Sequence, residues 1–122
     1  MYTLAVSREF IARHYLIGGD WGRENEVHSH HYRAEIRVTG YELDRHGYLL
    51  DIVELDRAVQ LVIERVSEQV LNDLAEFADL NPSIERLACH VWGELMNVLA
   101  LYDHKLAVRI WENASDWAEY SE

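Results

Sequence analysis

Alternation of apolar and polar side chains is the feature that most limits what this chain can fold into. Between residues 32 and 38 every even position is apolar or aromatic, and every odd position is charged. The same period of two runs through residues 2–14, with Arg8 and Ile11 as exceptions. Because successive side chains of a strand point to opposite faces, both segments are predicted to be strands with one buried face.

Two longer segments follow the helical period instead. Apolar residues between Leu55 and Val70 recur at helical spacing, which predicts a helix over about residues 54–70. A second helical series begins after Asn81-Pro82 and continues to about residue 101. This dipeptide is a typical helix start, because asparagine caps free backbone amides and proline tolerates the first helical position.

A third alternating segment follows the helices, with Leu106, Val108 and Ile110 on its apolar side. The order strand, strand, helix, helix, strand indicates an α+β fold in which two helices cover a largely antiparallel sheet. A chain of 122 residues suffices for one hydrophobic core, and no repeat or linker divides it. We therefore predict a single domain over residues 1–122.

The charge balance excludes broad classes of partner. A net charge of -11 leaves little basic surface for phosphate groups, so neither nucleic acid nor an acidic membrane is expected as a partner. No apolar stretch reaches the roughly 20 residues of a membrane span, and the N-terminus lacks the order of a signal peptide, so a cytoplasmic location is expected. The single cysteine, Cys89, is expected on the buried face of the second helix.

Three of the seven histidines lie where a metal site could form. His28 and His30 are two residues apart at the start of the second strand, so the pleat points both imidazoles to the inward face. His14 ends the first strand on its apolar parity, and the three rings converge if these strands pair. Three neutral imidazoles with an open fourth position make a catalytic zinc site, so zinc is the expected metal. His31 has the opposite parity and should point away.

The third strand adds one inward polar group. Glu112 continues the apolar parity of that strand, so its carboxylate is predicted to point inward, where it needs a partner. It could accept hydrogen bonds from the amino and ring N–H groups of a pterin or guanine edge. It could equally form a salt bridge with an arginine.

Six segments, in this order and spacing, resemble the family of 6-pyruvoyl-tetrahydropterin synthase and its bacterial relative 6-carboxy-tetrahydropterin synthase. They cover nearly the whole chain. The segments are Phe10-Ile11-Ala12-Arg13-His14, His28-Ser29-His30-His31-Tyr32, Gly47-Tyr48-Leu49-Leu50-Asp51-Ile52-Val53-Glu54-Leu55, Leu71-Asn72, Asn81-Pro82-Ser83-Ile84-Glu85 and Trp111-Glu112-Asn113.

The resemblance implies a T-fold subunit, with an antiparallel four-stranded sheet and two long helices packed on one face. It also implies a homo-oligomer, a hexamer built from two trimers, with active sites at subunit interfaces that take dihydroneopterin triphosphate. Zinc is implied on His14, His28 and His30, and the pterin ring is implied to be held by Glu112.

The chain departs from the family pattern at the residues that transfer protons. The family has a catalytic cysteine four residues before the first of the paired zinc histidines, whereas this chain has Glu24 there and Glu26 two residues later. An Asp-His pair of the family aligns with Ser67 and Glu68. The family glycine between the zinc histidines is Ser29, a milder change that a strand can absorb.

A carboxylate can replace a thiolate as general base where burial or a neighbouring carboxylate raises its pKa. Glu24 and Glu26 share strand parity with His28 and His30, and Glu24 is the candidate base. The alternative is that both glutamates are solvated loop residues. Some relatives with glutamate in place of the cysteine cleave the dihydroneopterin side chain to a hydroxymethyl pterin.

The leading hypothesis is a zinc-dependent lyase acting on the side chain of dihydroneopterin or its triphosphate, in pterin or 7-deazaguanine biosynthesis. Glu24 would move protons, with Glu68 assisting, and Glu112 would hold the ring. A second hypothesis is a subunit that has lost catalysis and binds a pterin or purine. A third is an enzyme that acts on a related heterocycle.

Overall fold

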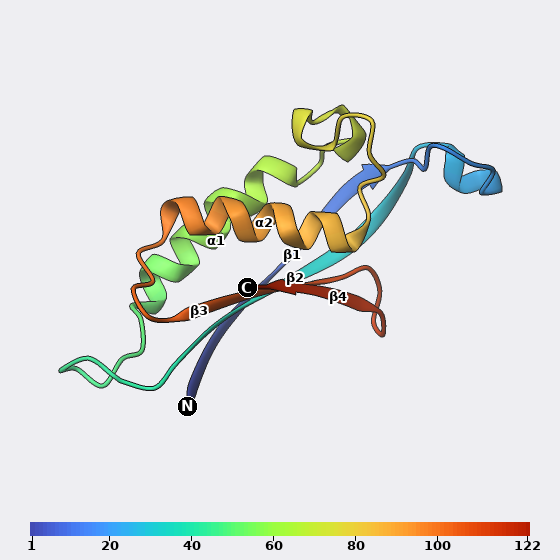
Figure 1. The fold of residues 1–122 in the computed structure, drawn as a ribbon. Helices are drawn as coiled ribbons and strands as arrows, with labels where there is room; N and C mark the ends of the chain where they lie inside the picture. The colour runs from blue at the N-terminus through green and yellow to red at the C-terminus, as the bar shows by residue number, and fades with distance from the viewer.

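The computed structural model describes residues 1–122 and contains one sheet, two long helices and three short 3₁₀ helices. The strands lie in the order β1-β2-β3-β4, and each neighbouring pair is antiparallel. Both long helices lie on one face of the sheet (Figure 1), so the predicted architecture is confirmed. The elements are β1 (Tyr2–His14), η1 (Gly22–Asn25), β2 (His28–Gly40), α1 (Ile52–Val66), η2 (Leu71–Asp73), η3 (Ala75–Phe77), α2 (Ile84–Val98), β3 (Lys105–Trp111) and β4 (Trp117–Ser121).

The apolar parity of the strands is the face that packs against the helices. Tyr32, Ala34, Ile36 and Val38 of β2 are all buried, and they belong to a core of 22 buried hydrophobic side chains. Each fully buried valine, leucine or isoleucine contributes roughly 1.5–3 kcal/mol to stability. The packed sheet is therefore a firm support for the residues at the end where β1 stops and β2 begins.

Helix α1 ends at Val66, before the predicted end at residue 70. Ser67 leaves the helical conformation, and Glu68 adopts a left-handed φ of 62°. The N–H of Glu68 donates to the carbonyl of Ile11 at 2.6 Å, and Val70 forms an isolated parallel bridge with β1. The apolar spacing was misleading here because the edge of β1 offers the backbone other partners.

Helix α2 is also shorter than predicted, since it begins at Ile84 and ends at Val98. Its cap is Ser83, whose hydroxyl accepts from the N–H of Arg86 at 3.2 Å. Asn81 is not the cap. Its side chain is turned toward the loop that follows β1 instead.

The helices bury one stripe and expose the rest. On α2 the buried stripe includes Leu87, Ala88 and Val91, whereas Cys89 falls outside it and is exposed. The prediction of a buried thiol is therefore wrong. Neither long helix combines the length and the apolar character that crossing a membrane requires.

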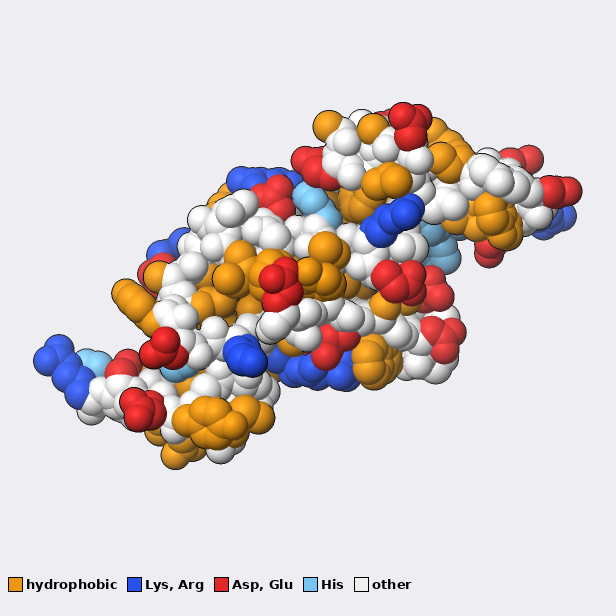
Figure 2. Space-filling view, in the orientation of Figure 1, with side chains coloured by type: hydrophobic (Ala, Val, Ile, Leu, Met, Phe, Trp, Pro, Cys, Tyr) orange, Lys and Arg blue, Asp and Glu red, His pale blue; other side chains and the backbone are white.

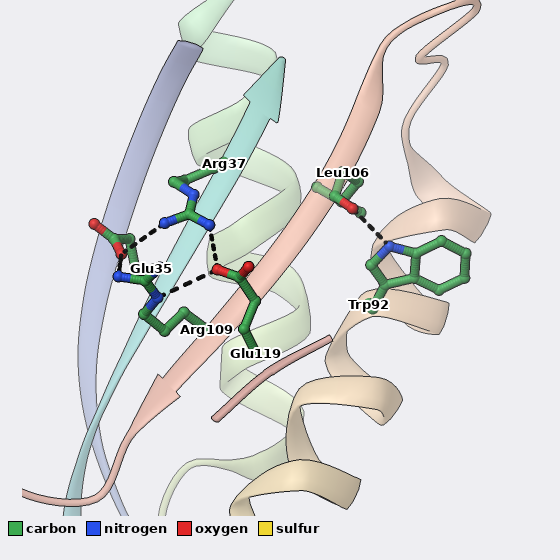
Figure 3. A network of polar contacts seen from close by, with 6 residues as sticks. All are labelled: Glu35, Arg37, Trp92, Leu106, Arg109 and Glu119. Atoms are coloured by element: carbon green, nitrogen blue, oxygen red, sulfur yellow. Dashed lines mark hydrogen bonds and ion pairs between the residues drawn. The ribbon is translucent and has the colours of Figure 1, made fainter. Parts of the chain in front are cut away.

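The face of the sheet that the helices leave open carries a charged network (Figure 3). Glu119 of β4 accepts hydrogen bonds from Arg37 of β2 and from Arg109 of β3. Glu35 lies 3.8 Å from Arg37 and 3.7 Å from Arg109, so the network ties three strands together. Near these strands, the indole of Trp92 donates to a carbonyl of β3 at 3.0 Å and fastens α2 to the sheet.

Candidate metal centre

The pairing of β1 with β2 brings the three predicted histidines together. His14 stands opposite His28 in the register, and His30 follows on the same face of β2. The ring centroids of His14 and His28 are 4.5 Å apart, those of His14 and His30 are 4.8 Å apart, and those of His28 and His30 are 5.0 Å apart. One ligand nitrogen from each ring lies within 4.8 Å of the other two, so this side-chain set suits a single metal ion.

Backbone carbonyls orient two of these rings. The Nδ1 of His14 lies 3.2 Å from the carbonyl oxygen of Pro82, and the Nδ1 of His28 lies 2.8 Å from that of Glu26. A carbonyl only accepts, so each Nδ1 carries the proton and donates it. The Nε2 of each ring is then free to bind a metal, an arrangement common among metal-bound histidines.

Burial favours the neutral imidazoles that a metal requires. Desolvation lowers the pKa of His14 below 6.5, although the hydrogen bond to Pro82 opposes this shift. Desolvation, together with the nearby charge of His28, also lowers the pKa of His30. Because protons compete with metal for the ring nitrogens, both shifts favour metal binding at neutral pH.

Two asparagine side chains hold the chain directly after His14. Asn72 accepts from the N–H of Tyr15 at 3.0 Å and donates to its carbonyl at 2.9 Å. Asn81 makes the same pair of bonds with Ile17, at 2.7 Å and 3.2 Å. Each side-chain amide thus makes the pair of hydrogen bonds that the backbone of a neighbouring strand would otherwise make. The two asparagines clamp the start of the loop that joins β1 to β2.

Glu24 lies near the three histidines, but strand parity is not the reason. It belongs to η1 rather than to a strand, so the parity shared with His28 does not apply. Its carbonyl accepts from the N–H of Leu16 at 2.8 Å, which folds the loop back on itself. The side chain is exposed, yet it lines a cleft together with the three histidines. In Figure 2 this loop projects as an arm, with histidine surface and acidic side chains near its root.

The cleft has a volume of about 520 Å³ and contains two further carboxylates. Glu112, directly after β3, lines it, and its negative charge partly offsets the lowering of the pKa of His30. Glu85, in the first turn of α2, also lines the cleft, although no role was predicted for it from the sequence. The sequence offered two signals for it: Glu85 ends a segment that resembles the family, and it lies near a helix start, where carboxylates are common for reasons unrelated to a site. Ser83 and Asn113 complete the polar lining.

Other predicted residues lie outside this lining. The side chain of Glu26 does not line the cleft, and only its carbonyl contributes, through His28. Glu68 lies beside the edge of β1, where its carbonyl accepts from Arg13 at 2.8 Å. His31 is exposed on the opposite face of β2, as its parity predicted.

A second cleft of about 560 Å³ adjoins the first and shares Glu112 and Asn113 with it. Its wall includes Tyr32, Arg33 and Trp111, and the guanidinium of Arg33 lies 4.6 Å from the centre of the Trp111 ring. Burial, followed by the negative charge of Glu112, raises the pKa of Tyr32 well above its usual range. The phenol therefore keeps its proton at neutral pH.

Solved structures share this fold. The 6-pyruvoyl tetrahydropterin synthase of Caenorhabditis elegans matches with a TM-score of 0.85 at 23% identity, covering 99% of this chain and 95% of that chain. A Plasmodium vivax 6-pyruvoyltetrahydropterin synthase, described as a catalytic-residue mutant with a glutamate changed to alanine, matches with a TM-score of 0.82 at 15% identity. That match covers 99% of this chain and 97% of that chain. The fold and its histidine cleft define a T-fold protein.

The chain belongs to the 6-pyruvoyl tetrahydropterin synthase family, whose family model matches residues 3–122. A protein of Archaeoglobus fulgidus proposed to be a 6-carboxy-5,6,7,8-tetrahydropterin synthase is 27% identical over 120 residues, covering 95% of this chain and 92% of that protein. The 6-pyruvoyl tetrahydrobiopterin synthase of Drosophila melanogaster is 32% identical over 95 residues, covering 76% of this chain and 56% of that protein. The family consists of lyases of tetrahydropterin synthesis.

Proposed function

We propose that this protein is a zinc-dependent lyase acting on the side chain of dihydroneopterin or its triphosphate. The observation that carries the proposal is the convergence of His14, His28 and His30 with Glu24 and Glu112 in one cleft. Three neutral imidazoles suit zinc and leave one position for a ligand oxygen. Zinc bound there supplies Lewis acidity toward a side-chain hydroxyl.

Glu112 is proposed to hold the heterocycle. A carboxylate accepts two parallel hydrogen bonds, and a pterin edge offers a ring N–H beside an amino group. Since Glu112 lines the same cleft as the histidines, a ring anchored there extends its side chain toward them. This geometry supports cleavage in the side chain rather than in the ring.

Glu24 is proposed to move protons. In a retro-aldol cleavage it removes the proton from the hydroxyl group of the side-chain carbon that leaves as an aldehyde. The bond between that carbon and the ring-side carbon breaks, and its electron pair takes up a proton at the ring-side carbon. The Plasmodium vivax relative supports this role, because a glutamate is its named catalytic residue. Glu24 is exposed in the single chain, so the proposal requires a neighbouring subunit or the ligand to exclude water from it.

We further propose a homo-oligomer, a hexamer of two trimers. Strand β4 and the part of strand β1 before Ile11 are open edges of the sheet, and open edges pair readily with other chains. Glu26 and Glu68 do not line the cleft of their own chain, so they can assist only at a cleft shared between subunits. The cytoplasmic location and the lack of nucleic-acid and membrane partners stay predictions from the sequence.

A second candidate function is binding of a pterin or purine without catalysis. It is favoured by the loss of the family cysteine and Asp-His pair, whose positions hold Glu24, Ser67 and Glu68. The metal and ring-binding residues would then serve recognition alone. A lyase acting on a related heterocycle is the third candidate, and a screen of pterins, folates and purines for turnover separates it from the first.

The deciding experiment incubates zinc-loaded protein with dihydroneopterin triphosphate and follows the pterin products by mass spectrometry. We expect side-chain cleavage that is lost in Glu24→Gln and in His28→Ala, and we expect His28→Ala to lose zinc. His46→Ala is the matched control, because His46 is exposed in a turn and lines neither cleft, and it should retain both zinc and turnover. Binding of unchanged substrate by the wild-type protein would instead support the binding module.

A further inference from the structure

The hydroxyl of Tyr32 is a buried polar group without a partner. Tyr32 is 1% exposed, and its hydroxyl oxygen has no hydrogen-bond partner in the structure. The ring is fixed by its neighbours, since it stacks on Phe10 with centroids 5.2 Å apart and lies 5.5 Å from the ring of His30. A buried donor left unpaired is costly, so an acceptor is expected within reach.

The register of the sheet identifies that acceptor. Arg33 of β2 and Trp111 of β3 are the last pair of the register, and continuing the register by one residue beyond the end of β3 places Tyr32 opposite Glu112. Residues opposite each other in an antiparallel pair have Cβ atoms roughly 4.5–5.5 Å apart on one face. Both residues also line the second cleft. No arginine or lysine makes a salt bridge with Glu112 in the structure, so its carboxylate is available as an acceptor.

We propose that Tyr32 is a positioning residue for Glu112, donating its hydroxyl proton in a hydrogen bond to the Glu112 carboxylate. Rotation of the glutamate side chain brings the carboxylate to the phenol, whose own position is fixed by packing. The bond sets the plane of the carboxylate and leaves its remaining lone pairs toward the cleft. A ring edge with two adjacent N–H donors then meets an acceptor that is already oriented.

This inference deepens the proposed function, because it gives Glu112 its orientation as the ligand anchor. It also assigns two roles to two residues: Glu112 contacts the ligand, and Tyr32 orients Glu112. A free glutamate side chain loses rotational freedom when it binds a ligand, and that loss weakens binding. A glutamate already held by Tyr32 loses less, so the hydroxyl should improve ligand affinity without touching the ligand.

The test is a double-mutant cycle in zinc-loaded, ligand-free protein. Tyr32→Phe removes one oxygen and keeps the ring stack, and Glu112→Ala removes the acceptor. We expect Tyr32→Phe to lower the thermal midpoint when Glu112 is present and to leave it unchanged or raise it in the Glu112→Ala background. Zinc content should stay the same in Tyr32→Phe. Additive effects of the two changes on the midpoint overturn the inference.

A binding measurement adds the second arm, with 7,8-dihydroneopterin as the probe and titration calorimetry as the readout. We expect Tyr32→Phe to raise the Kd by up to about tenfold, because Glu112 then has to lose its own side-chain freedom when the ligand binds. Tyr120→Phe is the matched control, because its hydroxyl bonds Glu122 outside the clefts, and its Kd should equal that of the wild type. An unchanged Kd in Tyr32→Phe contradicts the orientation of Glu112 by Tyr32.

The two arms separate failure of the inference from failure of the proposed function. If the wild-type protein binds no dihydroneopterin, the proposed function fails and the stability cycle alone decides the role of Tyr32. Coupling in that cycle then still supports the Tyr32–Glu112 bond. If dihydroneopterin binds but the cycle is additive, the inference fails while the proposed function stands.

Discussion

His30 and His31 are neighbours in the chain, yet they lie on opposite faces of β2. The strand repeat of two decides this difference, because one residue of displacement reverses the direction of a side chain. His30 consequently joins His14 and His28 at the cleft, whereas His31 is exposed. At the scale of single residues, the side of the strand and the burial there decide what an imidazole can do. The same imidazole group is a candidate ligand on one face and a solvated side chain on the other.

The lowered pKa of His14 predicts how stability should depend on pH. After removal of metal by a chelator, the unfolded chain binds a proton at His14 near pH 6.5, whereas the folded protein resists it to a lower pH. The contribution of neutral His14 to the free energy of unfolding is therefore present above pH 6.5 and is lost as the pH falls through the pKa of His14 in the folded protein. The thermal midpoint should drop between about pH 7.5 and about pH 5.5, and less steeply in His14→Gln. The control is His31→Gln, whose thermal midpoint should fall as steeply as that of the wild type. An equal fall of the midpoint in wild type and His14→Gln would contradict this prediction.

At the scale of elements, the site depends on loops that are held by side chains. The segment after His14 has no strand partner, and Asn72 and Asn81 supply the missing hydrogen bonds. The first asparagine belongs to η2 and the second precedes α2, so two distant elements meet at one loop. The position of Glu24 depends on this loop because the carbonyl of Glu24 is bonded to Leu16.

Replacing Asn72 by alanine should weaken this loop and the site that follows from it. Two partly buried hydrogen bonds to Tyr15 are lost, which should cost roughly 1–3 kcal/mol of unfolding free energy. Asn97→Ala is the matched control, since Asn97 is exposed on α2, and it should be neutral or slightly stabilising. Urea denaturation measures both. If Asn72→Ala loses no more unfolding free energy than Asn97→Ala, the hydrogen bonds of Asn72 do not stabilise the protein.

At the scale of the whole molecule, the cleft of one chain does not enclose all the residues that are proposed to transfer protons. The cleft is open, Glu24 is exposed, and Glu68 lies at the edge of β1 away from the cleft lining. Strand β4 and the part of strand β1 before Ile11 are also open edges of the sheet. These features fit a subunit whose cleft is completed by another copy of the same chain.

Mixed oligomers test whether Glu24 and Glu68 of different subunits form one site. Glu24→Gln and Glu68→Gln chains, unfolded together and refolded, should regain turnover above the mean of the two separate variants. Random mixing gives about a quarter of the sites both native glutamates when two subunits contribute to each site. Refolding each variant alone controls for losses during refolding. No gain on mixing would mean that the two residues do not act across an interface.

The sequence by itself determined the sheet, the helices and the three histidines. Strand parity needs only local sterics, so the inward face of β1 and β2 was readable before any contact was known. The pairing of those strands then carried His14 to His28 and His30. The family resemblance added the fourth strand, because β4 is only five residues long and too short for alternation to reveal.

Only the tertiary structure decided the ends of the helices and the lining of the cleft. Residues after Val66 had helical spacing, but the edge of β1 offered their backbone stronger partners. Glu24 reached the cleft through the fold of η1, and Glu85 joined it from the first turn of α2. Such contacts depend on partners distant in the sequence, and no local pattern records which distant group will satisfy a given backbone or carboxylate.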